Sequence, residues 1–129
     1  MNKVVLDASA MLAYINNERG AQAVHDVLSR SVVSTVNLTE AFSKLVREGM
    51  DVNDTRTVLQ ECFPDAVPVD RDQAETAAII HAANAKMNVS YADSMCLALG
   101  ACRDVPILTC DQKWKKLELG FDVDIRLIR

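Results

Sequence analysis

Five short runs rich in β-branched residues alternate with helical patterns along this 129-residue chain. The runs lie at residues 3–7, 32–36, 66–69, 105–109 and 123–128. Between them, apolar residues recur at spacings of three and four, which is typical of helices with one buried face. Strands separated by helices favour parallel pairing, because each helix returns the chain to the same edge of the sheet. We therefore predict an α/β fold with a mostly parallel sheet covered by helices on both faces.

The intervening segments give seven predicted helices, at residues 9–17, 20–30, 37–49, 54–63, 71–87, 90–102 and 111–118. Asn37 and Ser90 have the side chains expected of N-caps for the third and the sixth. The fifth helix carries small residues at helical spacing, which permit close packing on another helix or on a second subunit: Ala74, Ala78, Ala82 and Ala85. His81 lies on the same stripe and is expected to pack there rather than to act as a base.

The length fits one domain over residues 1–129, since a chain of this size can bury about two-thirds of its unfolded surface. The sequence has neither a run of about eighteen apolar residues nor a basic stretch leading into an apolar cleavage signal. None of its four cysteines forms a CxxC pair, which favours reduced thiols over a zinc site or disulfides. We expect a cytoplasmic protein with no membrane partner.

Four acidic residues fall where an α/β sheet gathers its ligands. Asp7 ends the first run, and Asp111 follows the fourth. Glu40 and Asp93 are each expected in the first turn of a helix that begins at the carboxyl edge of the sheet. Ligands of open parallel sheets bind beyond this edge, at the point where the strand order reverses. The sequence thus predicts that four carboxylates from four separate segments converge on one rim.

Each acid alone has a simple structural explanation as a helix cap or a turn residue. Together, like charges repel by about 4 kcal/mol per pair at 4 Å and an effective dielectric of 20. A bound cation would relieve this repulsion. Oxygen ligands without His or Cys select Mg²⁺ or Mn²⁺ over zinc.

A divalent ion held by carboxylates suits the hydrolysis of phosphodiesters, because it lowers the pKa of a bound water and offsets charge on the leaving oxygen. The sequence offers no patterned Ser or Cys nucleophile and no GxxxxGK[ST] loop. Hydrolysis by metal-activated water is therefore the chemistry we predict. Ser9 and Thr109, each two residues from a strand-end acid, could orient that water or a carboxylate, or could serve as a helix cap and an ordinary strand residue.

The net charge of −4 is unevenly distributed. Residues 48–75 hold eight acids and only two basic residues, which leaves twelve basic and ten acidic residues elsewhere. The densest basic cluster is Lys113, Lys115 and Lys116. It is either part of a surface for nucleic acid or a solvated helix end.

Four stretches resemble one known family: "VVLDASAMLA", "STVNLTEAFSKL", "SYADSMCLALG" and "VPILTCDQKW". Together they are similar to the PIN domain, and in particular to the VapC-type toxins of toxin–antitoxin pairs. The resemblance runs from the first strand to the closing "VDIRLIR". It implies a three-layer α/β/α sandwich with a five-stranded parallel sheet in the order 3-2-1-4-5.

The resemblance also implies a function. The acidic quartet of the family corresponds to Asp7, Glu40, Asp93 and Asp111, and its polar residue near the tip of the fourth strand to Thr109. Such proteins resemble Mg²⁺- or Mn²⁺-dependent endoribonucleases that cut RNA such as tRNA or rRNA. They are usually dimers and are inhibited by a cognate antitoxin.

Three alternatives remain open at this stage. An aspartyl-phosphate phosphatase would use a strand-end Asp as nucleophile, but it usually needs a second acid two residues on, where this chain has Ser9. A non-catalytic PIN-like domain would bind RNA or a partner without turnover. A nuclease for DNA or structured flaps would differ only in its substrate.

Overall fold

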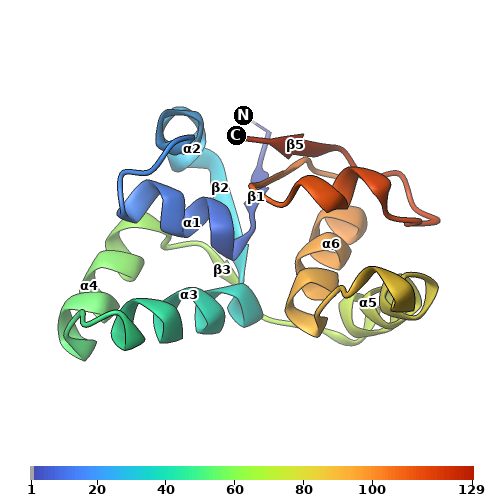
Figure 1. Cartoon of the computed structure of the whole chain (residues 1–129), viewed down its shortest axis with the longest axis horizontal. Coiled ribbons are helices and arrows are strands. Elements are labelled where there is room, and N and C mark those ends of the chain that lie inside the picture. The colour runs from blue at the N-terminus through green and yellow to red at the C-terminus, as the bar shows by residue number, and fades with distance from the viewer. Residues whose placement is uncertain (1) are drawn as a thin grey trace.

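A computed structural model describes residues 2–129 of the chain (Figure 1). The elements follow in the order β1 (Val4–Leu6), α1 (Ala8–Ile15), α2 (Ala21–Val27), η1 (Leu28–Arg30), β2 (Ser31–Ser34), α3 (Thr35–Arg47), α4 (Val52–Cys62), β3 (Ala66–Val67), α5 (Arg71–Ala83), η2 (Ala85–Met87), α6 (Tyr91–Arg103), β4 (Ile107–Thr109), η3 (Gln112–Lys116) and β5 (Ile125–Leu127), where η marks a 3-10 helix. Along the described residues, no helix combines the length and the apolarity needed to cross a membrane.

The five strands form one sheet in the order β3-β2-β1-β4-β5, and every pair is parallel. The predicted fold class and strand order are therefore confirmed. Val5 in the central strand β1 is in register with Val32 of β2 on one side and Ile107 of β4 on the other. The direction of strand succession reverses between β1 and β4, so this pair marks the switch point of the sheet.

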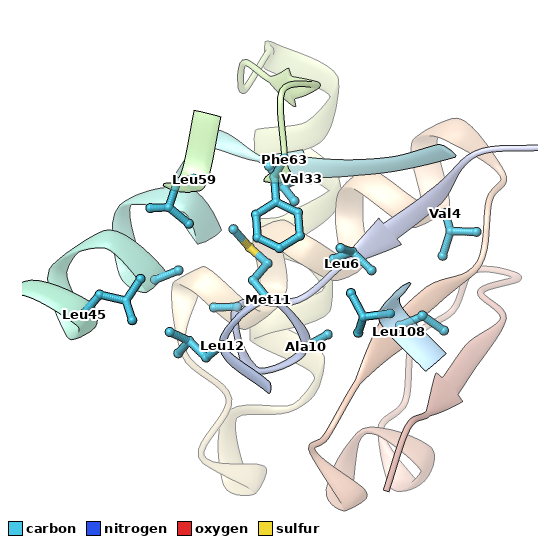
Figure 2. Close-up of a cluster of buried hydrophobic side chains, with 13 residues drawn as sticks. Val4, Leu6, Ala10, Met11, Leu12, Val33, Leu45, Leu59, Phe63 and Leu108 are labelled. Carbon is cyan, nitrogen blue, oxygen red and sulfur yellow. The ribbon is translucent and has the colours of Figure 1, made fainter. Parts of the chain in front are cut away.

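Alternate residues of the strands pack into two separate cores. Val4 and Leu6 contact α1–α4 on one face, as Figure 2 shows, whereas Val5 joins the cluster under α5, α6 and η3. Figure 1 shows α1, α3 and α4 on one side of the sheet and α5 and α6 on the other. Successive side chains of each strand point to opposite faces of the sheet, and both faces are covered by helices. The result is three layers, with the sheet between two layers of helices.

Helix α3 begins three residues earlier than the sequence suggested. Ser34 is its N-cap and accepts a hydrogen bond from the backbone N–H of Val36 at 3.2 Å. The predicted strand through residue 36 and the predicted cap at Asn37 are both wrong, because β-branched residues fit the first turn of a capped helix as well as a strand. Glu40 consequently lies in the second turn of α3, not the first.

Helices α5 and α6 form an antiparallel hairpin, which supplies the chain path that the sequence left undetermined. Cys102 Sγ and Thr76 Oγ1 are 3.6 Å apart at one end, and the rings of His81 and Tyr91 stack at the other. This hairpin returns the chain to the carboxyl edge of the sheet, where α6 begins with its acidic first turn.

The small-residue stripe of α5 does not pack on α6. The hairpin instead buries the opposite side of α5, with Gln73, Ala77 and Ile80. The predicted helix over residues 71–87 ends at Ala83, so the stripe spans two elements. It is exposed: Ala74, Ala78 and Ala82 of α5 and Ala85 of η2. The stripe therefore faces solvent in the part of the chain that the structure describes.

Gly100 of α6 lies directly against β4. A Cβ at this position would be 2.5 Å from Cγ1 and from Cδ1 of the fully buried Ile107. The Gly100→Ala variant should lower the free energy of unfolding by about 1 to 2 kcal/mol, because overpacking outweighs the gain of about 1 kcal/mol in helix propensity. Guanidinium unfolding measures this change. Adding Ile107→Val should recover part of the loss, and a more stable single variant would contradict the close packing.

Candidate active site

Asp7 lies at the tip of β1, in the N-cap position of α1, and only 4% of its surface is exposed. Its side chain does not cap the helix. Two hydroxyls donate to Oδ2 instead: Ser9 Oγ at 2.8 Å and Thr109 Oγ1 at 2.9 Å. Among the hydrogen bonds formed by residues 2–129, none reaches Oδ1. The carboxylate is thus held by one oxygen and has the other available for a ligand.

The loops after β1 and β4 are joined by hydrogen bonds. Thr109, fully buried, also accepts from the backbone N–H of Asp111 at 3.0 Å, and Ser9 Oγ accepts from that of Cys110 at 3.0 Å. The same two hydroxyls therefore contact Asp7 and fix the turn that carries Asp111. These contacts form because β1 and β4 are adjacent parallel strands, so the loops that follow them lie side by side.

Glu40 and Asp93 lie close enough to Asp7 to act on its titration. Burial raises the pKa of Asp7 from 3.8 to about 6, the Ser9 and Thr109 hydroxyls oppose this shift, and the charges of Asp93 and Glu40 add to it. The pKa of Glu40 is also raised, chiefly by burial and then by Asp93. The carboxylates at the tip of β1, in α3 and in α6 are therefore close enough for their charges to affect one another's pKa values.

Asp93 and Asp111 also have local partners. Asp93 Oδ2 accepts from the Ser90 N–H at 3.1 Å while Ser90 Oγ caps the helix, which completes the capping box that the sequence indicated. Asp111 caps η3 through the Lys113 N–H at 3.1 Å, and its Oδ2 is 3.8 Å from Lys113 Nζ. Within residues 2–129, no three side chains of Asp, Glu, His or Cys form a group placed to hold a metal ion.

The chemistry of the donors still fits Mg²⁺ or Mn²⁺ rather than zinc. The thiol of Cys96 is fully buried, and burial above all, and then the charge of Asp7, raises its pKa well above the ordinary value. The pKa of Cys110 is also raised, mainly by burial. Thiols that stay protonated are poor metal ligands, so carboxylate oxygens are the available donors. Burial is the largest cause of the raised pKa values of Asp7 and Glu40, and the charge of Asp93 adds to both; a cation bound beside these carboxylates would favour their ionised forms.

Asn37 is a site residue that the sequence analysis treated only as a cap. It is fully buried in α3, one turn before Glu40, and its Nδ2 donates to the carbonyl of Ala92 in α6 at 3.1 Å. Its hydrogen bonding also lowers the pKa of Glu40. The available signal was an Asn three residues before an acid on the same helical stripe, although Glu40 itself is exposed. Asn37 ties the two acid-bearing helices together.

The three lysines of the basic cluster have different surroundings. Lys113 Nζ donates to the Asn88 carbonyl at 3.1 Å beside Asp111. Lys115 Nζ donates to the carbonyl of Ile125 in β5. Lys116 is exposed. Lys113 is therefore the one placed beside the acidic rim.

The raised pKa of Asp7 gives the stability of the metal-free protein a defined pH dependence. Between about 4 and 6 the folded state binds more protons at Asp7 than the unfolded state, so the free energy of unfolding should fall as the pH rises through this range. The expected decrease is on the order of 2 to 3 kcal/mol. Unfolding in a chelator at pH 4 to 7 measures it, and Asp7→Asn should remove this contribution, while the raised pKa of Glu40 leaves a part of the slope. Equal slopes in both proteins would contradict the shift.

Several solved structures share this fold. The DNA-bound VapBC complex from Salmonella typhimurium matches with a TM-score of 0.78 and 16% identity over 100% of both chains. VapBC-5 from Mycobacterium tuberculosis matches with a TM-score of 0.69 and 22% identity, covering 97% of this chain and 98% of that one. The sarcin–ricin loop cleaving toxin VapC20 from the same organism matches at 0.70 and 14%, covering 93% and 97%.

The sequence comparisons give a consistent assignment. No curated protein matches this sequence significantly. A family model for the PIN domain matches residues 4–119, which include all four predicted acids and both hydroxyl residues at the strand tips. The chain belongs to the PIN domain family.

Proposed function

We propose that this protein is the toxin of a toxin–antitoxin pair and acts as an Mg²⁺- or Mn²⁺-dependent endoribonuclease. The observation that carries the proposal is the buried Asp7 at the switch point, whose pKa is raised by burial and by the charges of Asp93 and Glu40. Similar structures described as VapBC complexes and as a toxin that cleaves the sarcin–ricin loop support the same reading.

Asp7, Glu40, Asp93 and Asp111 would hold the ion. Bound there, it would lower the pKa of a water and offset charge on the phosphodiester. The protein would orient the Asp7 carboxylate. Ser9 and Thr109 donate to its Oδ2, so Oδ1 is left to bind the ion. Ser9 also occupies the position where a phosphatase would carry its second acid, so hydrolysis by water remains the better supported chemistry.

The test uses purified protein and total RNA, with Mn²⁺, with Mg²⁺, and with a chelator. We expect metal-dependent cleavage at a few defined sites, read by mapping the new RNA ends. DNA and structured flaps serve as comparison substrates. Metal uptake without cleavage of any RNA would support the non-catalytic alternative instead.

The basic residues of η3 should contribute to RNA binding. We expect the triple variant Lys113→Ala, Lys115→Ala, Lys116→Ala to weaken RNA binding and to lower the slope of log Kd against log salt, by about 0.7 for each lost contact with single-stranded RNA. Because Lys115 donates to a backbone carbonyl of β5, most of the effect should come from Lys113 and Lys116. Electrophoretic mobility shifts at several salt concentrations measure it. Unchanged affinity and slope would assign the three lysines to an ordinary solvated surface.

The proposal includes two protein partners and a cytoplasmic location. An apolar hollow of about 510 Å³ between α3 and α4, lined by Leu38, Phe42, Leu59 and Phe63 among others, offers a docking place for an apolar segment of an antitoxin. The exposed small-residue stripe of α5 offers a surface for a second copy of the chain. Sedimentation of the protein alone and with its antitoxin tests both assemblies.

A further inference from the structure

An aromatic pair lies beside the acids and takes no part in the chemistry described so far. Tyr91 is 75% exposed, although it is the first residue of α6. Its ring stacks on His81 of α5, with the ring centroids 4.2 Å apart and the planes 18° from parallel. His81 supports one face of the tyrosine ring, and the exposure of Tyr91 leaves the other face in solvent.

The pair is fixed at the acidic rim. Tyr91 and Asp93 share the first turn of α6 and are separated by about 3 Å along the helix axis, although their side chains leave the helix on different sides. Ala92, between them, accepts the hydrogen bond from Asn37 of α3. The position of the tyrosine relative to Asp93 and Glu40 is therefore set by buried packing rather than by a flexible loop.

Basic side chains flank the same segment. Lys113 Nζ donates to the carbonyl of Asn88, three residues before Tyr91, and lies 3.8 Å from Asp111 Oδ2. Lys86 of η2 and Lys116 of η3 line a shared hollow together with Ala82. An exposed aromatic face, cations within the adjoining turns and an acidic centre are thus gathered at one end of the α5–α6 hairpin.

Unpaired bases stack on aromatic side chains, whereas bases inside a duplex are already stacked and cannot do so. The backbone phosphates beside such a base need cations. We propose that Tyr91, supported by His81, binds an unpaired base of the RNA substrate next to the cleaved bond, with Lys113 beside a flanking phosphate. The substrate is accordingly single-stranded at this position. This inference rests on the proposed ribonuclease function.

An interface between two copies of the chain is the competing use of this surface, since His81 lies on the exposed stripe of α5. The small residues of that stripe carry no charge, and two of them, Ala74 and Ala78, lie on the N-terminal side of His81, away from the start of α6. The stacked pair lies at the end of α6 that carries Asp93, and Lys113 binds the Asn88 carbonyl three residues before Tyr91, a setting that suits a nucleotide better than a second protein surface.

The experiment measures RNA binding without cleavage, in a chelator. The probe is a short single-stranded RNA containing 2-aminopurine, whose fluorescence is quenched on stacking, and the comparison ligand is the same RNA annealed to its complement. We expect Tyr91→Ala to weaken single-strand binding roughly 5- to 100-fold and to abolish the quenching. Tyr91→Phe should retain both, and Val52→Ala, an exposed apolar residue of α4, should behave as the unaltered protein. Duplex binding should change little in any variant.

Sedimentation of Tyr91→Ala is run in parallel. Unchanged single-strand affinity and quenching in this variant would overturn the proposal, as would an equal loss for single strand and duplex. A dimer that becomes a monomer on this substitution would assign the surface to an interface between copies. If the unaltered protein quenches the probe through Tyr91 but never cuts RNA with Mn²⁺, the ribonuclease function fails while the base-binding site stands.

Discussion

Replacing Asp7 by Asn should abolish Mn²⁺-dependent RNA cleavage while leaving the fold intact. We expect a loss of more than about 100-fold, because partners that only orient a metal ligand already contribute about 10- to 100-fold. Asn retains the size of Asp and can still accept from Ser9 and Thr109, so the strand tip keeps its hydrogen bonds. Only the negative charge disappears.

Stability should move in the opposite direction from activity. At pH 7 the buried carboxylate of Asp7 is held against its raised pKa, so its removal should increase the free energy of unfolding of the metal-free protein. Mn²⁺ should stabilise the unaltered protein but not the variant. Initial cleavage rates, calorimetric Mn²⁺ titration and guanidinium unfolding give the three readouts, with Asp122→Asn as an exposed control outside the site. An active Asp7→Asn variant would remove Asp7 from the site.

Replacing Thr109 by Val should cost both activity and stability. The hydroxyl donates to Asp7 and accepts from the backbone of Asp111, and the residue is fully buried. Val has nearly the same shape but leaves the Asp111 N–H without this acceptor, which typically costs about 1 to 3 kcal/mol. Cleavage should fall about 10- to 100-fold, as expected for a group that orients a metal ligand.

The conservative variant separates these effects. Thr109→Ser keeps the hydroxyl and loses one methyl group, so it should retain most of the cleavage activity and Mn²⁺ affinity while losing some stability. Loss of the Asp7 donor in Thr109→Val should also raise the pKa of Asp7 further, which a pH titration of metal binding would detect. If Thr109→Val binds Mn²⁺ and cleaves RNA like the unaltered protein, the hydroxyl is only part of the core.

Most of the architecture could be predicted from local patterns. The strand positions followed from buried β-branched runs, and the tips of β1 and β4 followed from the acids that end them. The order of the strands came from the family resemblance, since hydrophobic periodicity does not specify which strands are neighbours. The capping box of Ser90 and Asp93 was predictable because its donors and acceptors lie within one turn.

Two kinds of feature were not predictable: a boundary at which two local patterns compete, and contacts between distant segments. The start of α3 depends on whether Thr35 and Val36 pair as strand or turn into helix, and Ser34 decides this by accepting the Val36 N–H. The path of α5 depends on packing against α6, a segment that lies later in the chain. The hydrogen bond of Lys115 to the carbonyl of Ile125 likewise depends on where β5 lies.

The buried amide of Asn37 has an evolutionary consequence. It joins α3 to α6 through a backbone carbonyl rather than through Glu40 or Asp93. The connection between α3 and α6 therefore does not depend on Glu40, and a lineage could lose that acid by drift while the two helices stay joined. Such a descendant would lack one carboxylate of the predicted quartet but would keep the packing of its helices.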